Sequence, residues 1–163
     1  MKEQIQLIAL EFGQLSTRLL HLNKQIGALA KQSLDCQLLM SIPGIGPIIS
    51  TAMLGRVDIK NHFQSAREFA VWLGLTSRQS GSGGRSMMHG ITKRGDRYLR
   101  KQLIHGTRKA MRTCRGKDDR FSQWVNNLII RRGINKACVA LAHKLARLCW
   151  ILLQRNEPFA YNK

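Results

Sequence analysis

Apolar side chains near the N-terminus recur at a spacing that alternates between three and four residues. The series consists of Ile5, Ile8, Phe12, Leu15, Leu19, Leu22, Ile26 and Leu29. Over more than three heptads, this spacing keeps one narrow seam on one side of a helix, which predicts a coiled coil or a helical hairpin in residues 1–34. The alternative is an amphipathic helix packed onto the core of the same chain. The strict seam favours pairing, because a helix of a globular core shows a wider apolar face.

A turn rich in glycine and proline follows between two apolar stretches. Residues 41–47 read Ser-Ile-Pro-Gly-Ile-Gly-Pro, and Pro47 suits the first turn of the next helix. The turn resembles the helix-hairpin-helix motif of DNA-binding proteins. Gly44 and Gly46 would let the backbone approach a phosphate, and the helix N-terminus would present free N–H groups to it. A plain helical turn and a hairpin used for protein contacts are the alternatives.

The remaining pattern predicts further helices and no strand. Residues 65–75 begin with a serine cap and stop near Gly74, and more helices are expected from Ile91, over about 120–131 and from Ile134 to Leu153. Residues 76–90 hold four glycines and four serines with no acidic residue, which predicts a mobile loop. The predicted fold class is therefore all-α, or mainly α, with residues 35–163 forming one domain after the coiled-coil segment.

Charge indicates the kind of partner. The chain has 163 residues and a formal net charge of +18. Residues 78–120 alone carry 13 basic and three acidic residues, a net charge of +10. So strong a positive field favours a polyanion, and nucleic acid is preferred over an anionic membrane surface or a ribosome-like assembly.

Several classes of protein do not fit the sequence. The four cysteines lack CxxC spacing and the five histidines are dispersed, so we expect reduced structural cysteines and no metal site in this chain. No apolar run reaches the roughly 20 residues of a membrane span, and the N-terminus lacks a signal-peptide pattern. We therefore expect a cytoplasmic protein without a membrane partner.

Residues 78–85 are the candidate for covalent chemistry. Their serines lie between glycines, and Arg78 and Arg85 could stabilise the transition state at a phosphodiester. By composition alone, a solvated flexible linker is the alternative. Only nine acidic residues are present, scattered singly apart from Asp118 and Asp119, so a multi-carboxylate Mg²⁺ site is not expected here.

Four motifs occur in order at residues 41–47, 69–75, 78–84 and 90–100, and a later segment at 136–147 accompanies them. Together they resemble the C-terminal domain of transposases of the insertion-sequence 110 family, most similar to its 1111 branch. Pilin-gene DNA invertases share this domain. The likeness covers residues 35–153.

The resemblance implies a recombinase in which a RuvC-like domain with a DEDD set of metal-binding carboxylates is joined to a coiled coil and this domain. It also implies that a serine of this domain attacks a DNA phosphodiester. The serine-glycine step places that nucleophile at Ser82, with Ser80 as the runner-up. Mg²⁺ in the full-length enzyme and a structured guide RNA that selects the DNA target are implied in the same way. The chain is expected to lack the RuvC-like domain and, alone, to bind nucleic acid without exchanging strands.

The residues expected to contact nucleic acid offer either a bare backbone or a positive charge. They are Gly44, Gly46, Arg78, Arg85, Lys93, Arg94, Arg97, Arg100 and Lys101. A homo-oligomer formed through residues 1–34 is also expected. Two alternative functions are a non-catalytic helix-hairpin-helix binding module and an oligomerisation module.

Overall fold

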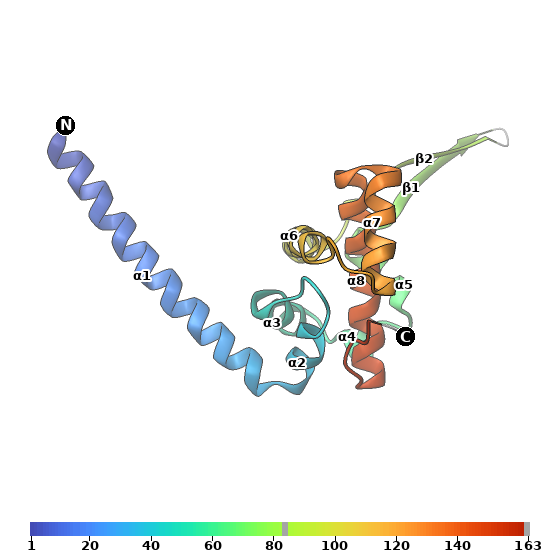
Figure 1. Ribbon diagram of the computed structural model, residues 1–163, viewed down its shortest axis with the longest axis horizontal. Helices are drawn as coiled ribbons and strands as arrows, with labels where there is room; N and C mark the ends of the chain where they lie inside the picture. The colour runs from blue at the N-terminus through green and yellow to red at the C-terminus, as the bar shows by residue number, and fades with distance from the viewer. Residues whose placement is uncertain (83–84, 162–163) are drawn as a thin grey trace.

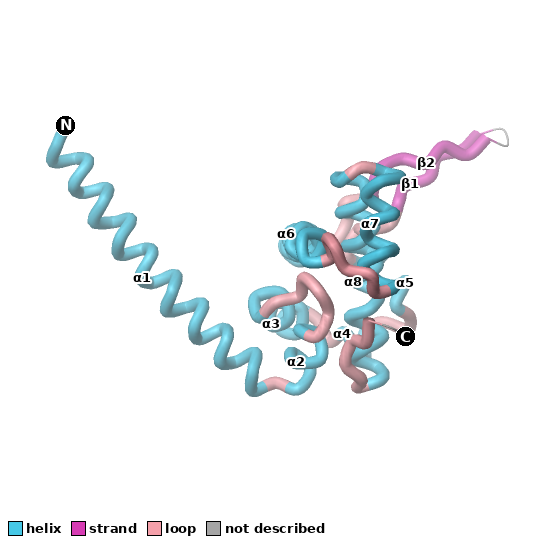
Figure 2. Tube along the Cα trace, viewed as in Figure 1, coloured by secondary structure: helices cyan, strands magenta, loops and turns pink. Residues whose placement is uncertain are grey.

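The structure is a computed structural model that describes residues 1–82 and 85–161, with the side chains of Ser82 and Arg85 outside that description. Its helices are α1 (Lys2–Gln32), α2 (Leu34–Met40), α3 (Pro47–Arg56), α4 (Ile59–His62), α5 (Ala66–Trp72), α6 (Arg97–Thr113), α7 (Arg120–Arg132) and α8 (Ile134–Arg155). Two strands, β1 (Ser77–Ser82) and β2 (Arg85–Ile91), lie between α5 and α6. The predicted mainly α fold class is confirmed (Figure 2).

Helix α1 extends away from the rest of the molecule (Figure 1). Only its C-terminal end meets the body, where Ala30 is buried and Ile26 is half-buried beside α2 and α3. Ser33 ends α1 and caps α2, because its hydroxyl accepts a hydrogen bond from the Cys36 N–H at 3.3 Å. The predicted helix is confirmed, and the apolar seam does not pack onto the core of its own chain. Coiled-coil pairing stays a prediction.

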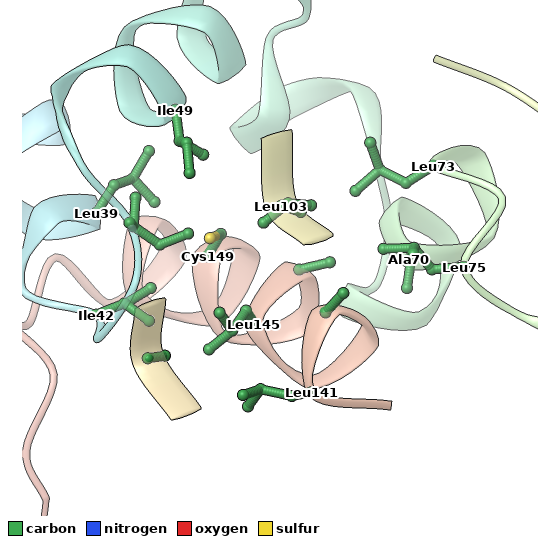
Figure 3. Close-up of a cluster of buried hydrophobic side chains, with 14 of the residues drawn as sticks. Leu39, Ile42, Ile49, Ala70, Leu73, Leu75, Leu103, Leu141, Leu145 and Cys149 are labelled. Carbon is green, nitrogen blue, oxygen red and sulfur yellow. The ribbon is translucent and has the colours of Figure 1, made fainter. Parts of the chain in front are cut away.

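The core of the body is built around α8. Leu141, Leu145 and Cys149 lie along its length, fully buried against residues from α2, α5 and α6 (Figure 3). Helix α8 has the length and hydropathy of a membrane span, and half of that window is buried within the body. These contacts account for the apolar composition of α8, since the central helix of a helical domain must be apolar around most of its circumference.

The turn before α3 brings two backbones close together. Pro47 starts α3 as predicted, and Gly44 has a positive φ of 89°. A Cβ atom at Gly44 would lie 2.4 Å from the carbonyl oxygen of Gly106, in the middle of α6. Gly44 therefore joins this turn to α6, whereas a Cβ at Gly46 would meet nothing within 4 Å.

The predicted mobile loop at 76–90 is wrong. Strands β1 and β2 form an antiparallel hairpin in which Gly81 pairs with Ser86 and Ser82 with Arg85, and an irregularity lies between Ser77 and Gln79. The hairpin projects from the body (Figure 2), and its described side chains between 77 and 90 are exposed. Neither face packs on a core, so the segment lacks the alternation of apolar and polar residues by which a half-buried strand is recognised.

The start of α6 also differs from the expectation of a helix from Ile91. β2 continues to Ile91, and α6 begins only at Arg97, where Asp96 caps it. The intervening residues form a loop because Lys93 and Gly95 have positive φ angles of 57° and 90°, which interrupt a right-handed helix.

Candidate nucleic-acid interface

Tight backbone packing fixes the base of the β1–β2 hairpin. Gly74 and Gly95 have positive φ angles, and a Cβ on either would lie less than 2 Å from a carbonyl oxygen, that of Arg94 or Trp72 respectively. The Thr92 N–H donates to the Thr76 carbonyl at 2.8 Å, and the Lys93 N–H donates to the Gly74 carbonyl at 3.1 Å. The hairpin therefore projects from a rigid base.

Arg100 of α6 stabilises the base of the hairpin through hydrogen bonds to backbone carbonyls. Its side chain is buried, and its Nη1 donates to the carbonyl oxygens of Leu73 at 2.9 Å and Arg94 at 3.3 Å. The guanidinium thus links the end of α5 to the loop that enters α6. Arg100 was predicted to contact nucleic acid, but its side chain is buried here, because it falls on the face of α6 that also carries the buried Leu99 and Leu103.

The N-terminus of α6 is held by a carboxylate. Asp96 accepts from the Leu99 N–H at 2.8 Å and pairs with Arg56 of α3 at 2.7 Å. Burial raises the pKa of Asp96, but the hydrogen bonds from Leu99 and Arg56 and the Arg56 charge outweigh it, so the pKa lies below its ordinary value. The Arg56 guanidinium also lies 4.8 Å from the centre of the Tyr98 ring. Together these contacts set the direction in which α6 leaves the hairpin.

The hairpin carries the candidate nucleophiles. Ser82 ends β1 and pairs in register with Arg85, but its side chain, like that of Arg85, lies outside the described part. Gly83 and Gly84, which complete the serine-glycine motif, also lie outside it. Ser80 is exposed, and its Oγ lies 2.5 Å from Nε2 of His89 on β2. Such a bond lets an unprotonated Nε2 accept the hydroxyl proton.

Helix α6 presents a continuous basic stripe, which we define as Arg97, Lys101, His105, Arg108 and Arg112. These residues follow one another at intervals of four, four, three and four, and all are exposed. At 3.6 residues per turn they lie on one side of the helix, opposite the buried Leu99, Leu103 and Ala110. The stripe is about 22 Å long at 1.5 Å per residue, enough to follow several successive phosphates.

The structure brings some of the predicted residues together and separates others. Lys93 and Arg94 are exposed in the loop between the hairpin and the basic stripe, and Arg78 is exposed on β1. Arg97 and Lys101 belong to the stripe. Gly46 is free of close contacts, whereas Gly44 is committed to packing against α6.

Three stripe residues, His105, Arg108 and Arg112, were missing from the predicted interface. Extending the helical period from Arg97 and Lys101 would have found them, because positions 105, 108 and 112 continue the same helical face. The tight base of the hairpin gave no comparable signal, since it depends on close backbone contacts between α5 and the loop before α6.

The carboxylates of the described chain do not fit a Mg²⁺ site. No group of three His, Cys, Asp or Glu side chains comes together within residues 1–82 and 86–161. Instead, several acidic side chains have structural partners: Asp96 pairs with Arg56 and Asp35 with Lys60, while Asp58 and Asp119 cap helices. Residues already committed in this way do not offer the open oxygen ligands that Mg²⁺ requires.

Comparison with known proteins places this interface within a family. The profile described as "Transposase IS116/IS110/IS902 family" matches residues 36–123, which include the hairpin and the basic stripe. The chain is 41% identical over 149 residues to "Probable family 20 transposase" of Pseudomonas aeruginosa, covering 91% of this chain and 44% of that protein. It is 41% identical over 152 residues to the transposase for insertion sequence element IS1111A of Coxiella burnetii, covering 89% and 42%. For the transposase for insertion sequence element IS1328 of Yersinia enterocolitica, the identity is 36% over 124 residues, covering 76% and 37%. The chain thus spans about two fifths of the length of these relatives.

Proposed function

The chain belongs to the IS116/IS110/IS902 family of transposases, and we propose that it is the DNA-binding C-terminal part of a serine-dependent recombinase. This recombinase carries out DNA transposition. In this proposal the chain supplies the nucleophilic serine and part of the grip on DNA. A RuvC-like domain with the DEDD carboxylates supplies the remainder of the active site. The relatives bear the name transposase, and the shared region includes the residues proposed here to act.

One observation carries the proposal: an exposed serine-bearing hairpin stands on a rigid base directly before a basic helix face. A narrow hairpin can approach a phosphodiester more closely than a helix with long side chains can. The small residue Gly81 beside the serines leaves room for the phosphate and its sugars. Lys93, Arg94 and the basic stripe then supply contacts to neighbouring phosphates that fix the register of the DNA.

The chemistry proposed for the serine is a reversible phosphoryl transfer. The hydroxyl oxygen of Ser82 forms a bond to phosphorus, and the bond from phosphorus to one sugar oxygen breaks. The hydroxyl loses its proton to a base, and the departing sugar oxygen gains one. Attack on the phosphoserine by a free hydroxyl of another strand reverses these changes and completes the exchange. An ordinary serine hydroxyl is a weak nucleophile at neutral pH, so activation is required.

Ser80 is the alternative nucleophile, and one feature favours it. Its hydroxyl already contacts His89, which could take the proton during attack. The serine-glycine match of the family supports Ser82. Both serines lie on β1, two residues apart.

The proposed partners follow from the same surfaces. DNA would contact the hairpin and the basic stripe, and a structured guide RNA would use the remaining basic surface and select the target. Association of several copies through α1 would bring two such units together. Mg²⁺ would belong to the RuvC-like domain, in keeping with the structural commitments of the carboxylates described above. The expected location is the cytoplasm, at the nucleoid.

A non-catalytic role is the second candidate function. The long exposed seam of α1 and the open turn at Gly46 would suit a module that only binds nucleic acid or assembles copies. Such a module would not depend on the hydroxyl of either serine.

The test supplies this chain with a RuvC-like domain, Mg²⁺, guide RNA and target DNA, and looks for protein–DNA adducts that survive denaturation. We expect Ser82→Ala to abolish the adduct while DNA binding is kept. Ser86→Ala is the matched control, since it removes an exposed hydroxyl from the neighbouring strand. Loss of the adduct with Ser80→Ala alone would move the nucleophile to Ser80. An adduct that survives both serine changes would leave the hairpin without a covalent role.

A further inference from the structure

The seam of α1 is open over a defined length. Six of its residues, Ile5, Ile8, Phe12, Leu15, Leu19 and Leu22, are between 56% and 72% exposed. The next seam residue, Ile26, is half-buried against the body, and the neighbouring Ala30 is completely buried. The continuous exposed stretch of the seam, on the part of α1 that extends into solvent in Figure 1, therefore runs from Ile5 to Leu22, and the last seam residue, Leu29 (61% exposed), lies beyond the half-buried Ile26.

We propose that this open seam binds a second copy of itself in the antiparallel direction, with the two-fold axis between residues 13 and 14. The proposal specifies the pairing within the association through α1 proposed above. In this register Ile5 faces Leu22 of the second copy, Ile8 faces Leu19, and Phe12 faces Leu15. Each of the six open residues gains a partner. The register also satisfies antiparallel coiled-coil geometry, because every pair joins an a position of one helix to a d position of the other.

The charges beside the seam select this direction. Phe12 and Leu19 are a positions of the heptad. Glu11 and Arg18 precede them and therefore occupy g positions, which flank the interface. Antiparallel helices bring g positions of the two copies together. In the register set by the apolar pairs, Glu11 faces Arg18 of the second copy, and the symmetry repeats this ion pair.

A parallel pair would leave the same charges without ionic partners. In that arrangement each g position faces an e position five residues further along the second copy. Glu11 would then face Ser16, and Arg18 would face Asn23. The parallel pair offers no opposite-charge contact at these flanking positions, so charge complementarity favours the antiparallel pair.

The antiparallel arrangement places the two bodies at opposite ends of the paired helices. Residue 31 lies about 17.5 residues from the two-fold axis in each copy, so the two Lys31 positions are about 53 Å apart along the axis at 1.5 Å per residue. In a parallel dimer they would lie roughly 10 Å apart between helix axes. The two directions are therefore distinguished by one distance.

Charge reversal in the full 163-residue chain tests the direction. Glu11→Arg makes both flanking residues basic, and Arg18→Glu makes both acidic, so each variant alone should dissociate with a constant roughly tenfold higher than the unchanged chain in sedimentation. Mixing the two variants should restore association, and so should the double exchange in one chain. Glu3→Arg and Lys24→Glu are matched controls, because both positions point away from the seam.

A distance measurement gives an independent readout. A spin label on Lys31→Cys, which is exposed and also points away from the seam, should report a separation of about 53 Å between copies. The four native cysteines are buried, which confines labelling to the new site. A short separation of roughly 20 Å, or equal association of both charge-reversal variants and the unchanged chain, would overturn the antiparallel pair. A chain that stays monomeric at micromolar concentration would overturn pairing between copies, without touching the proposed role of the serines.

Discussion

Arg100 and Lys101 are adjacent in the sequence, and the structure assigns them opposite roles. Arg100 is buried and donates to two backbone carbonyls, whereas Lys101 is exposed on the basic stripe of α6. We predict that Arg100→Met lowers the free energy of unfolding and that Lys101→Met lowers the affinity for DNA. Both substitutions remove one positive charge and insert the same side chain, so they form a matched pair.

The magnitude for Arg100→Met follows from its two hydrogen bonds. A bond from a charged donor contributes about 2 kcal/mol, and the longer bond at 3.3 Å contributes about 1 kcal/mol. Methionine fills part of the space but leaves the carbonyls of Leu73 and Arg94 without this donor. We therefore expect a loss of about 3 kcal/mol, which for a chain of this size lowers Tm by roughly 6–12 °C. Lys101→Met should change Tm by less than about 2 °C, as an exposed substitution does.

The assay combines thermal unfolding with DNA binding at several salt concentrations, below the Tm of every variant. Removing one phosphate contact reduces the slope of log affinity against log salt by about 0.9. We expect this reduction for Lys101→Met and an unchanged slope for Arg100→Met. If Arg100→Met kept full stability and lost the same salt-dependent affinity as Lys101→Met, the structural role of Arg100 would be refuted.

Three further predictions concern single positions. Gly44→Ala should destabilise the fold by about 2 kcal/mol or more in urea unfolding, because its Cβ would strike the Gly106 carbonyl at a positive φ. Gly46 meets no such contact but is the N-cap of α3, so Gly46→Ala should cost about 1 kcal/mol or less. Equal costs would contradict the packing of the turn. The carboxylate of Asp96 has a pKa below its ordinary value of 3.8, so its contribution to stability is complete above pH 3.8 and is lost as the pH falls through the lower, folded-state pKa. Asp96→Asn should weaken this acid dependence of the free energy of unfolding. An unchanged pH profile would refute this contribution of Asp96. Burial raises the pKa of the Cys149 thiol to about 12, so iodoacetamide at pH 8 should modify it only after unfolding, and rapid modification of the native chain would be inconsistent with the core described here.

Features that depend on local periodicity and composition can be predicted from the sequence alone. Residues close together in the chain account for four such features: the seam of α1, the start of α3 at Pro47, the serine-capped α5 and the long apolar α8. A helix repeats every 3.6 residues and its caps lie within one turn, so such elements are encoded locally. The concentration of positive charge likewise predicts a nucleic-acid partner from composition alone.

Which of these residues are exposed and which are held in packing contacts depends on tertiary structure. The hairpin formed by β1 and β2 has no buried face, so its sequence lacks the alternation of apolar and polar residues that predicts a strand. Backbone pairing between the two strands defines it instead. Arg100 reads like Arg97 in the sequence, yet the carbonyls of Leu73 and Arg94 turn it into a structural residue. Gly44 and Gly46 look equivalent in the motif, yet only Gly44 faces the backbone of α6. In each case the deciding contact comes from a segment distant in sequence or from across a turn, and a local pattern carries no information about it.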